Sequence, residues 1–171
     1  MHNTLFLVGF MGSGKTTVGK KLAKQLNKKF IDLDHFMVEE VGMSIPAYFE
    51  KFGEAQFREL ERDSLRKLAN SDAVVSTGGG SPCYFDNMDF MLSHGTVIYL
   101  ALTAKALWSR LQQSKIESRP ALKGLKNEEL LAFIEEKLAE RAPFYTQAHL
   151  QVDQLQTPIE NLVDIIAAYS K

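Results

Sequence analysis

The sequence has little of what disulfide-linked, metal-stabilised or membrane proteins need. It contains one cysteine, Cys83, so no disulfide can form within the chain. Its four histidines (His2, His35, His94 and His149) show no metal-ligand spacing, and no apolar run reaches the roughly 20 residues of a membrane span. The N-terminal MHNTLFLVGF has neither a basic segment nor a small-residue cleavage site, which is typical of a cytoplasmic protein.

The sequence also lacks an excess of charge of one sign. Its 171 residues include 20 Lys and Arg and 21 Asp and Glu, giving a net charge of −1. This balance provides no overall attraction to nucleic acid. Hydrophobic residues make up 45% of the chain, which is enough for a compact core at this length. We expect a single domain over residues 1–171, without a structural metal, a membrane segment or a nucleic-acid partner.

Short apolar segments alternate with segments of helical spacing along the whole chain. Five apolar runs predict strands, at residues 4–10, 28–34, 73–77, 96–102 and 149–153. Apolar residues at helical spacing predict helices at residues 16–27, 46–70 and 103–113, from residue 127 onward and over the C-terminal stretch that carries Ile159 and Ile166. The alternation predicts an α/β protein, a three-layer α/β/α sandwich around a mostly parallel five-stranded sheet. Ligands of such sheets bind at the carboxyl ends of the strands.

One segment fits neither pattern. Residues 114–126, SKIESRPALKGLK, are polar, basic and interrupted by Pro and Gly. We expect a mobile lid there, followed by a helix that begins at Asn127. Pro143, near the end of that helix in ERAPFY, is expected to end or kink it.

The most specific motif lies between the first predicted strand and the first predicted helix. Residues 9–16, GFMGSGKT, fit G-x4-G-K-[ST], the phosphate-binding loop (P-loop). The glycines allow consecutive backbone N–H groups to surround phosphates at the positive end of the helix. Lys15 would reach the β- and γ-phosphates, and Thr16 would offer its hydroxyl to Mg²⁺. The motif therefore predicts a P-loop NTP-binding fold that binds a nucleotide.

Two acidic residues, Asp32 and Asp34, close the second predicted strand. Strand alternation would point both carboxylates to the same side. One could hold the water shell of Mg²⁺, while the other orients an acceptor hydroxyl and accepts its proton. The alternative is a solvated acidic strand end.

Arg58 lies four residues after Glu54 and three before Glu61, so these side chains share one helix face. Such groups are often surface ion pairs. Because Phe49, Phe52 and Phe57 lie in the same stretch, Arg58 could instead be held rigidly for a substrate carboxylate.

Three consecutive glycines, at positions 78–80, follow the third predicted strand. Ordering them is entropically costly, so we expect a small polar ligand to approach their backbone, with a simple tight turn as the alternative. Two arginines, Arg119 in the predicted lid and Arg141 in ERAPFY, could be surface charges or could stabilise a phosphoryl group as it is transferred.

Together, the segments GFMGSGKTTVGKKLA, FIDLDHFMVEEVGMSI, FEKFGEAQFRELE, STGGG, RPAL and ERAPFY resemble the shikimate kinase family, over nearly the whole chain. The resemblance implies transfer of the ATP γ-phosphate to the 3-hydroxyl of shikimate, on the pathway to chorismate and aromatic amino acids. It also implies a monomer. After the glycines the chain reads SPCYFDNMDFM, where small and charged residues are more usual in that family.

The resemblance also implies roles for individual residues. Catalysis would involve Lys15, Asp34 and Arg119, with Arg119 as the lid arginine that contacts the transferring phosphate. Mg²⁺ would be held by Thr16 and, through water, by Asp32. ATP would be bound by Gly12, Ser13, Gly14, Lys15, Thr16, Thr17, Arg110, Arg119 and Gln156, and shikimate by Asp34, Arg58, Gly79, Gly80 and Arg141.

Two other functions fit parts of the sequence. A P-loop kinase for another small acceptor, such as gluconate or a nucleoside monophosphate, would share the scaffold. A nucleotide-dependent regulatory module would keep the P-loop but lose the acceptor side, where Asp34, Arg58, the glycines and Arg119 are all present.

Overall fold

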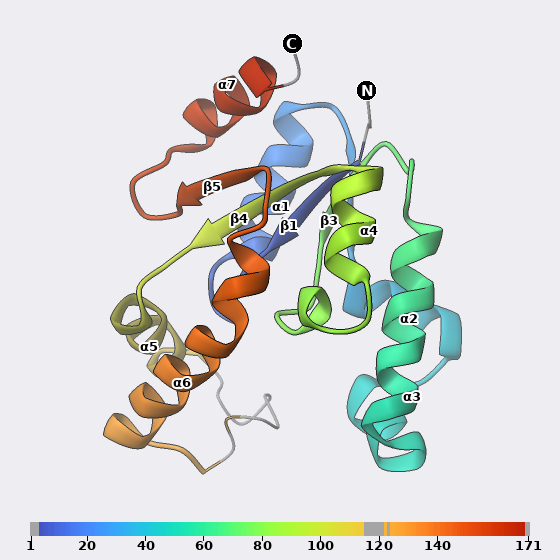
Figure 1. Ribbon diagram of the computed structural model, residues 1–171, viewed down its shortest axis with the longest axis vertical. Coiled ribbons are helices and arrows are strands. Elements are labelled where there is room, and N and C mark those ends of the chain that lie inside the picture. Colours follow the sequence, from blue (N-terminus) through green and yellow to red (C-terminus); the bar gives the residue numbers. More distant parts are fainter. Residues whose placement is uncertain (1–3, 115–121, 123, 170–171) are drawn as a thin grey trace.

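A sheet of five parallel strands forms the centre of the computed structural model, which describes residues 4–114, 122 and 124–169 (Figure 1). The strands are β1 (Leu5–Val8), β2 (Lys29–Asp32), β3 (Ala73–Ser76), β4 (Thr96–Ala101) and β5 (Leu150–Asp153). They lie in the order β2-β3-β1-β4-β5, and every adjacent pair is parallel. All five strands were predicted from apolar runs, and the sheet is entirely rather than mostly parallel.

Helices cover both faces of this sheet. They are α1 (Lys15–Gln25), α2 (Leu33–Val41), α3 (Ile45–Lys67), α4 (Asn87–His94), α5 (Ala104–Gln112), α6 (Asn127–Tyr145) and α7 (Ile159–Tyr169), with a short 3₁₀ helix, η1 (Ser81–Cys83). Helices α1 and α7 contact each other on one face. The remaining helices lie toward the opposite face or beyond the carboxyl ends of the strands (Figure 1). The three-layer arrangement is therefore confirmed.

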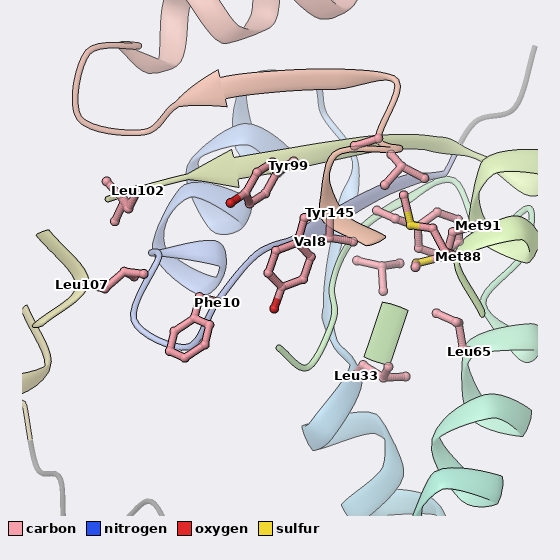
Figure 2. Close-up of a cluster of buried hydrophobic side chains, with 14 of the residues drawn as sticks. Val8, Phe10, Leu33, Leu65, Met88, Met91, Tyr99, Leu102, Leu107 and Tyr145 are labelled. Atoms are coloured by element: carbon pink, nitrogen blue, oxygen red, sulfur yellow. The ribbon is translucent and has the colours of Figure 1, made fainter. Parts of the chain in front are cut away.

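The two hydrophobic clusters follow from strand alternation. In β1, Leu5 and Leu7 pack with α1 and α7, whereas Phe6 and Val8 pack into the larger cluster on the other side. The larger cluster extends from Leu107 of α5, past Phe10 and the tilted pair Tyr99 and Tyr145, to the methionines of α4 (Figure 2). Because Phe10 belongs to this cluster, the start of the P-loop is anchored to the core.

The second strand is shorter than the sequence predicts. It ends at Asp32, and Asp34 lies in the first turn of α2, so the expectation that both carboxylates belong to one strand is wrong. Asp32 caps α2 by accepting hydrogen bonds from the backbone N–H groups of Asp34 (3.2 Å) and His35 (3.4 Å). Capping by an acidic residue outcompetes further strand pairing here.

The long predicted helix is present but bent. Ser44 caps α3, and Gly53 within it has φ 78° and ψ 176°. This backbone conformation is essentially restricted to glycine, so Gly53 divides the helix into a part before it and a part that carries Arg58. The bend was not predicted.

Pro143 does not end α6, which continues to Tyr145. Pro143 lacks the N–H that would bond to the carbonyl of Ala139 one turn earlier, yet two helical residues follow it. Of the two expected outcomes, that Pro143 ends the helix is wrong, and that it kinks the helix stays a prediction. Helices η1 and α4, between residues 81 and 94, were also not predicted.

Most of the predicted lid, including Arg119, lies outside the described residues. Within the part of the chain that is described, no helix has the length and apolar character needed to cross a membrane.

Candidate active site

The P-loop connects β1 to α1 and wraps around the side chain of its own lysine. Gly14, at φ 90°, precedes α1 and has no side chain to cap it, so first-turn N–H groups are left for an anion. The Lys15 ammonium is buried and donates to the carbonyl oxygens of Gly9 (2.7 Å) and Phe10 (3.0 Å). Ser13 is also buried, whereas Thr16 and Thr17 are exposed at the start of the helix. The loop therefore presents backbone donors and one buried cation.

Thr16 and Asp32 lie side by side beyond the loop. The Thr16 hydroxyl donates to Asp32 Oδ2 at 3.2 Å. No group of three or more His, Cys, Asp or Glu side chains that could hold a metal occurs among the described residues. Mg²⁺ needs no such group, since it usually keeps several waters and binds one or two protein oxygens together with substrate phosphates. The hydroxyl and carboxylate oxygens of Thr16 and Asp32 fit this requirement.

Asp34 lies among charges of both signs. It keeps an exposed surface, yet the surrounding protein replaces part of its water. This desolvation is the largest cause that raises the pKa of Asp34 from 3.8 to about 6, and the carboxylates of Asp32 and Glu61 add to it. Lys15 and Arg58 act in the opposite direction. Near neutral pH Asp34 is therefore a carboxylate that can accept a proton readily.

Arg58 is not a surface ion pair of the ordinary kind. Its Nη1 donates to Glu61 at 2.9 Å, and its Nη2 contacts Glu54 at 3.4 Å. Glu61 is 1% exposed and also accepts a hydrogen bond from the Ser81 hydroxyl. The loss of water lowers the pKa of Arg58, but Glu61 and Glu54 outweigh this, so the pKa rises and the guanidinium stays charged. The hypothesis that acidic neighbours hold Arg58 rigidly is supported by these contacts.

The glycines at positions 78–80 leave room for the side chains of Arg58 and Arg141. A Cβ on Gly80 would lie 3.1 and 3.2 Å from the two terminal nitrogens of Arg58. A Cβ on Gly79 would lie 3.3 Å from Arg141 Nη1 and 3.3 Å from the P-loop nitrogen of Met11. The glycine backbone therefore lies against both arginines and the P-loop, where an added side chain would be crowded.

Arg141 lies over an aromatic ring of the P-loop. Its guanidinium lies 5.3 Å from the centre of the Phe10 ring, and its buried Nη1 has no hydrogen-bond partner among the described residues. Tyr145, one turn later on α6, donates a hydrogen bond to the Gly79 carbonyl. A buried guanidinium nitrogen without an acceptor is suited to an anionic ligand.

Arg110 contacts the second half of the P-loop, at Gly12 and Gly14. It donates to the Gly12 carbonyl at 3.4 Å and to the side-chain oxygen of Gln154. Gln154 also lies near Gly14. Gln156, which the resemblance indicated, is exposed, and its backbone N–H donates to Asp153.

Several of these contributors could not be found by sequence reasoning. Tyr145 was included in ERAPFY without a role, and Gln154 was given none. Of the predicted residues, the structure brings together Lys15, Asp34, Arg58, the glycines and Arg141.

A P-loop at the end of a central parallel strand, with an adjacent Thr–Asp pair and an acceptor side of carboxylates and arginines, defines a P-loop kinase. The sequence profile of the shikimate kinase family matches residues 11–169. The chain therefore belongs to the shikimate kinase family, a family of ATP-dependent phosphotransferases, as the resemblance predicted.

Individual relatives agree with this assignment. The shikimate kinase of Parabacteroides distasonis is 49% identical over 150 residues, which cover 87% of this chain and 86% of the relative. The crystal structure of shikimate kinase from Bacteroides thetaiotaomicron superposes with a TM-score of 0.89 at 40% identity, covering 96% and 98% of the two chains. Shikimate kinase from Acinetobacter baumannii in complex with shikimate gives a TM-score of 0.82 at 34% identity, covering 96% and 90%.

Proposed function

We propose that the chain transfers the γ-phosphoryl group of ATP to the 3-hydroxyl of shikimate, giving shikimate 3-phosphate and ADP on the pathway to chorismate. Membership of the family supports this reaction, as does the related Acinetobacter enzyme described in complex with shikimate.

The observation that carries the proposal is the surroundings of the three glycines. Gly79 lies next to both the P-loop and Arg141, Gly80 lies against Arg58, and a Cβ on Gly78 would lie 3.6 Å from Asp34 Oδ1. Donor phosphate, acceptor hydroxyl and acceptor carboxylate would therefore each have a protein partner around one short backbone segment. The alternative of a regulatory module that has lost its acceptor side predicts that these contacts are scattered.

On the donor side, the P-loop N–H groups and Lys15 would bind the β- and γ-phosphates, and Arg110 would lie against the adenine. Thr16 and, through water, Asp32 would hold Mg²⁺, which when bound would offset the negative charge of the phosphates. Arg119 would contact the transferring phosphate, in keeping with the family resemblance. Thr17 and Gln156 complete the proposed nucleotide contacts.

On the acceptor side, Arg58 and Arg141 would bind the carboxylate of shikimate, and the backbone at Gly79 and Gly80 would line its ring. Asp34 would orient the hydroxyl and accept its proton as that oxygen bonds to the γ-phosphorus. The bond between the γ-phosphorus and the bridging oxygen breaks, and its electron pair leaves with ADP. Arg58 and Arg141 would thereby fix which hydroxyl meets the phosphate.

A coupled ADP-release assay with ATP and magnesium tests the proposal. Shikimate should support turnover, whereas gluconate and nucleoside monophosphates should not. Arg58→Ala should raise the KM for shikimate by about tenfold or more while ATP binding is retained. Arg62→Ala, one turn later on α3 and paired with Asp63, is the matched control. Turnover with gluconate but not with shikimate would contradict the assignment. An unchanged KM for shikimate in Arg58→Ala would contradict it as well.

Three further parts of the proposal need their own measurements. We propose that Mg²⁺ is the metal, so chelation should stop turnover and Mg²⁺ should restore it. We also propose a monomer, measured as the mass of the particle in solution by light scattering. A cytoplasmic location, without nucleic-acid or membrane partners, would be tested by cell fractionation.

A further inference from the structure

The guanidinium group of Arg58 lies over the ring of Tyr84. The distance from Arg58 Cζ to the centre of the Tyr84 ring is 3.9 Å, shorter than the 5.1 Å to the ring of Phe57. An arginine at this distance from a tyrosine face is attracted by the electrons of the ring, and the plane of its side chain is held parallel to the ring. Ion pairs with Glu54 and Glu61 act at the edges of the guanidinium, whereas the ring of Tyr84 acts on its face.

The hydroxyl of Tyr84 reaches one of those edge partners. It donates to Glu54 Oε1 at 3.0 Å, the same oxygen that lies 3.4 Å from Arg58 Nη2. Glu54 is 58% exposed, so water competes for it. The hydroxyl therefore shares the oxygen that would otherwise be available to Arg58 alone.

The backbone around Tyr84 is fixed independently of Arg58. Helix η1 begins with Ser81 and Pro82, and the Cys83 N–H donates to the Gly80 carbonyl at 2.9 Å. The buried side chain of Asn87 donates to the Ser81 carbonyl at 2.9 Å and accepts from Arg66 of α3 at 3.2 Å. The ring of Tyr84 is thus presented to α3 by a segment that is already hydrogen-bonded to that helix.

We propose that Tyr84 is a positioning residue for the acceptor. Its ring holds the Arg58 guanidinium in the plane in which it binds the acceptor carboxylate, and its hydroxyl shares with Arg58 Nη2 the Glu54 oxygen that both contact. This inference rests on the proposed function, in which Arg58 binds the carboxylate of shikimate. Tyr84 acts on the affinity for shikimate and leaves the chemical step to Lys15 and Asp34.

Steady-state kinetics of three variants test the inference. Tyr84→Ala removes the ring, Tyr84→Leu keeps apolar bulk without an aromatic face, and Tyr84→Phe keeps the face without the hydroxyl. We expect the first two to raise the KM for shikimate about tenfold, with kcat and the KM for ATP within about twofold of wild type. Tyr84→Phe should stay within about threefold, since the stacked face remains.

The neighbouring Phe85 supplies the matched control. It is 55% exposed and lies over Arg62, with 4.9 Å from Arg62 Cζ to the ring centre. Phe85→Ala should leave the KM for shikimate unchanged. Thermal unfolding of each variant shows whether the fold is intact.

Two results would overturn the inference while the proposed function stands. One is an active wild-type enzyme whose Tyr84→Ala and Tyr84→Leu variants keep the wild-type KM for shikimate. The other is a parallel change of both KM values and kcat with a lowered Tm, which would mean a merely structural role. A wild-type enzyme that releases no ADP with shikimate would overturn the proposed function and this inference together.

Discussion

Arg58 and Glu61 form an ion pair of 2.9 Å in which the carboxylate is 1% exposed and the arginine side chain 14% exposed. The same carboxylate accepts a hydrogen bond from Ser81, which follows the three glycines. Glu61 therefore connects α3, the helix that carries Arg58, to the start of η1, directly after the glycines. Because both partners are withdrawn from water, breaking this pair leaves a charge with poor solvation.

Glu61→Ala should lower the free energy of unfolding by about 3 kcal/mol, because it leaves Arg58 partly buried without its main partner. It should also raise the KM for shikimate, since Arg58 would no longer be held. Glu54→Ala removes the exposed partner of the same arginine and should cost less than about 1 kcal/mol. Urea unfolding of both variants measures the difference, and equal losses would contradict the structural role given to Glu61.

Lys15→Ala should lower kcat by about 10³-fold or more, because the transferring phosphoryl group loses its principal fixed cation. Lys20→Ala, on the same helix and over the ring of Phe30, should have wild-type kcat. A rapid-quench measurement of phosphoryl transfer separates the chemical step from product release. Wild-type transfer in Lys15→Ala would show that the P-loop does not act on the γ-phosphate.

The features that sequence reasoning predicted are those with a local signal. Continuous apolar runs predicted the strands, and the spacing of Arg58 and Glu61 predicted their pairing. The P-loop was predicted because its glycines, lysine and threonine must be consecutive. In each case the neighbours that determine the structure lie within a few residues along the chain.

The features that it missed depend on residues far apart in the sequence or on competing local signals. The apolar run before Asp32 favoured a longer strand, whereas the capping bonds to Asp34 and His35 ended it. Gly53 is the residue at which α3 bends. A glycine inside a helical pattern, however, predicts neither that a bend forms nor in which direction the helix turns. The contact of Gln154 with Arg110 depends on the place of β5 beside β4, about which the spacing of residues says nothing.

Gly79→Ala and Gly80→Ala should affect different substrates. Neither glycine has a positive φ, so the added methyl group acts through space alone. At Gly79 it would crowd both Arg141 and the Met11 nitrogen, and at Gly80 only Arg58 among the nearest atoms. We expect Gly79→Ala to raise both KM values and Gly80→Ala mainly that for shikimate, each by about fivefold or more, since overpacking costs about 1–3 kcal/mol. The opposite pattern would place the acceptor elsewhere.

The pH dependence of kcat/KM for shikimate should show an acidic limb near pH 6. Asp34 must be deprotonated to accept the hydroxyl proton, and its pKa in the free enzyme is raised to about 6. Activity should therefore fall tenfold per pH unit below this value. A profile that stays flat down to pH 5 would exclude Asp34 as the base, provided that the enzyme remains folded.

Asp34→Asn should make the protein less active and more stable. The proton acceptor is lost, so the rate of phosphoryl transfer should fall by about 10²-fold or more, with ATP binding retained. The same change removes a carboxylate that the folded state disfavours. Because the pKa of Asp34 is higher in the folded protein than its ordinary value of 3.8, wild-type stability falls as the pH rises from about 4 to about 6.

Asparagine carries no charge and avoids this loss. The raised pKa would correspond to about 3 kcal/mol, which solvent access to Asp34 reduces to about 1 kcal/mol. The Tm of Asp34→Asn should therefore exceed that of wild type by a few degrees above pH 6, and the difference should vanish near pH 4. A lower Tm at pH 7.5 would mean that the Asp34 carboxylate stabilises the fold. This would contradict a raised pKa and, with it, the argument that the pKa prepares Asp34 to accept a proton.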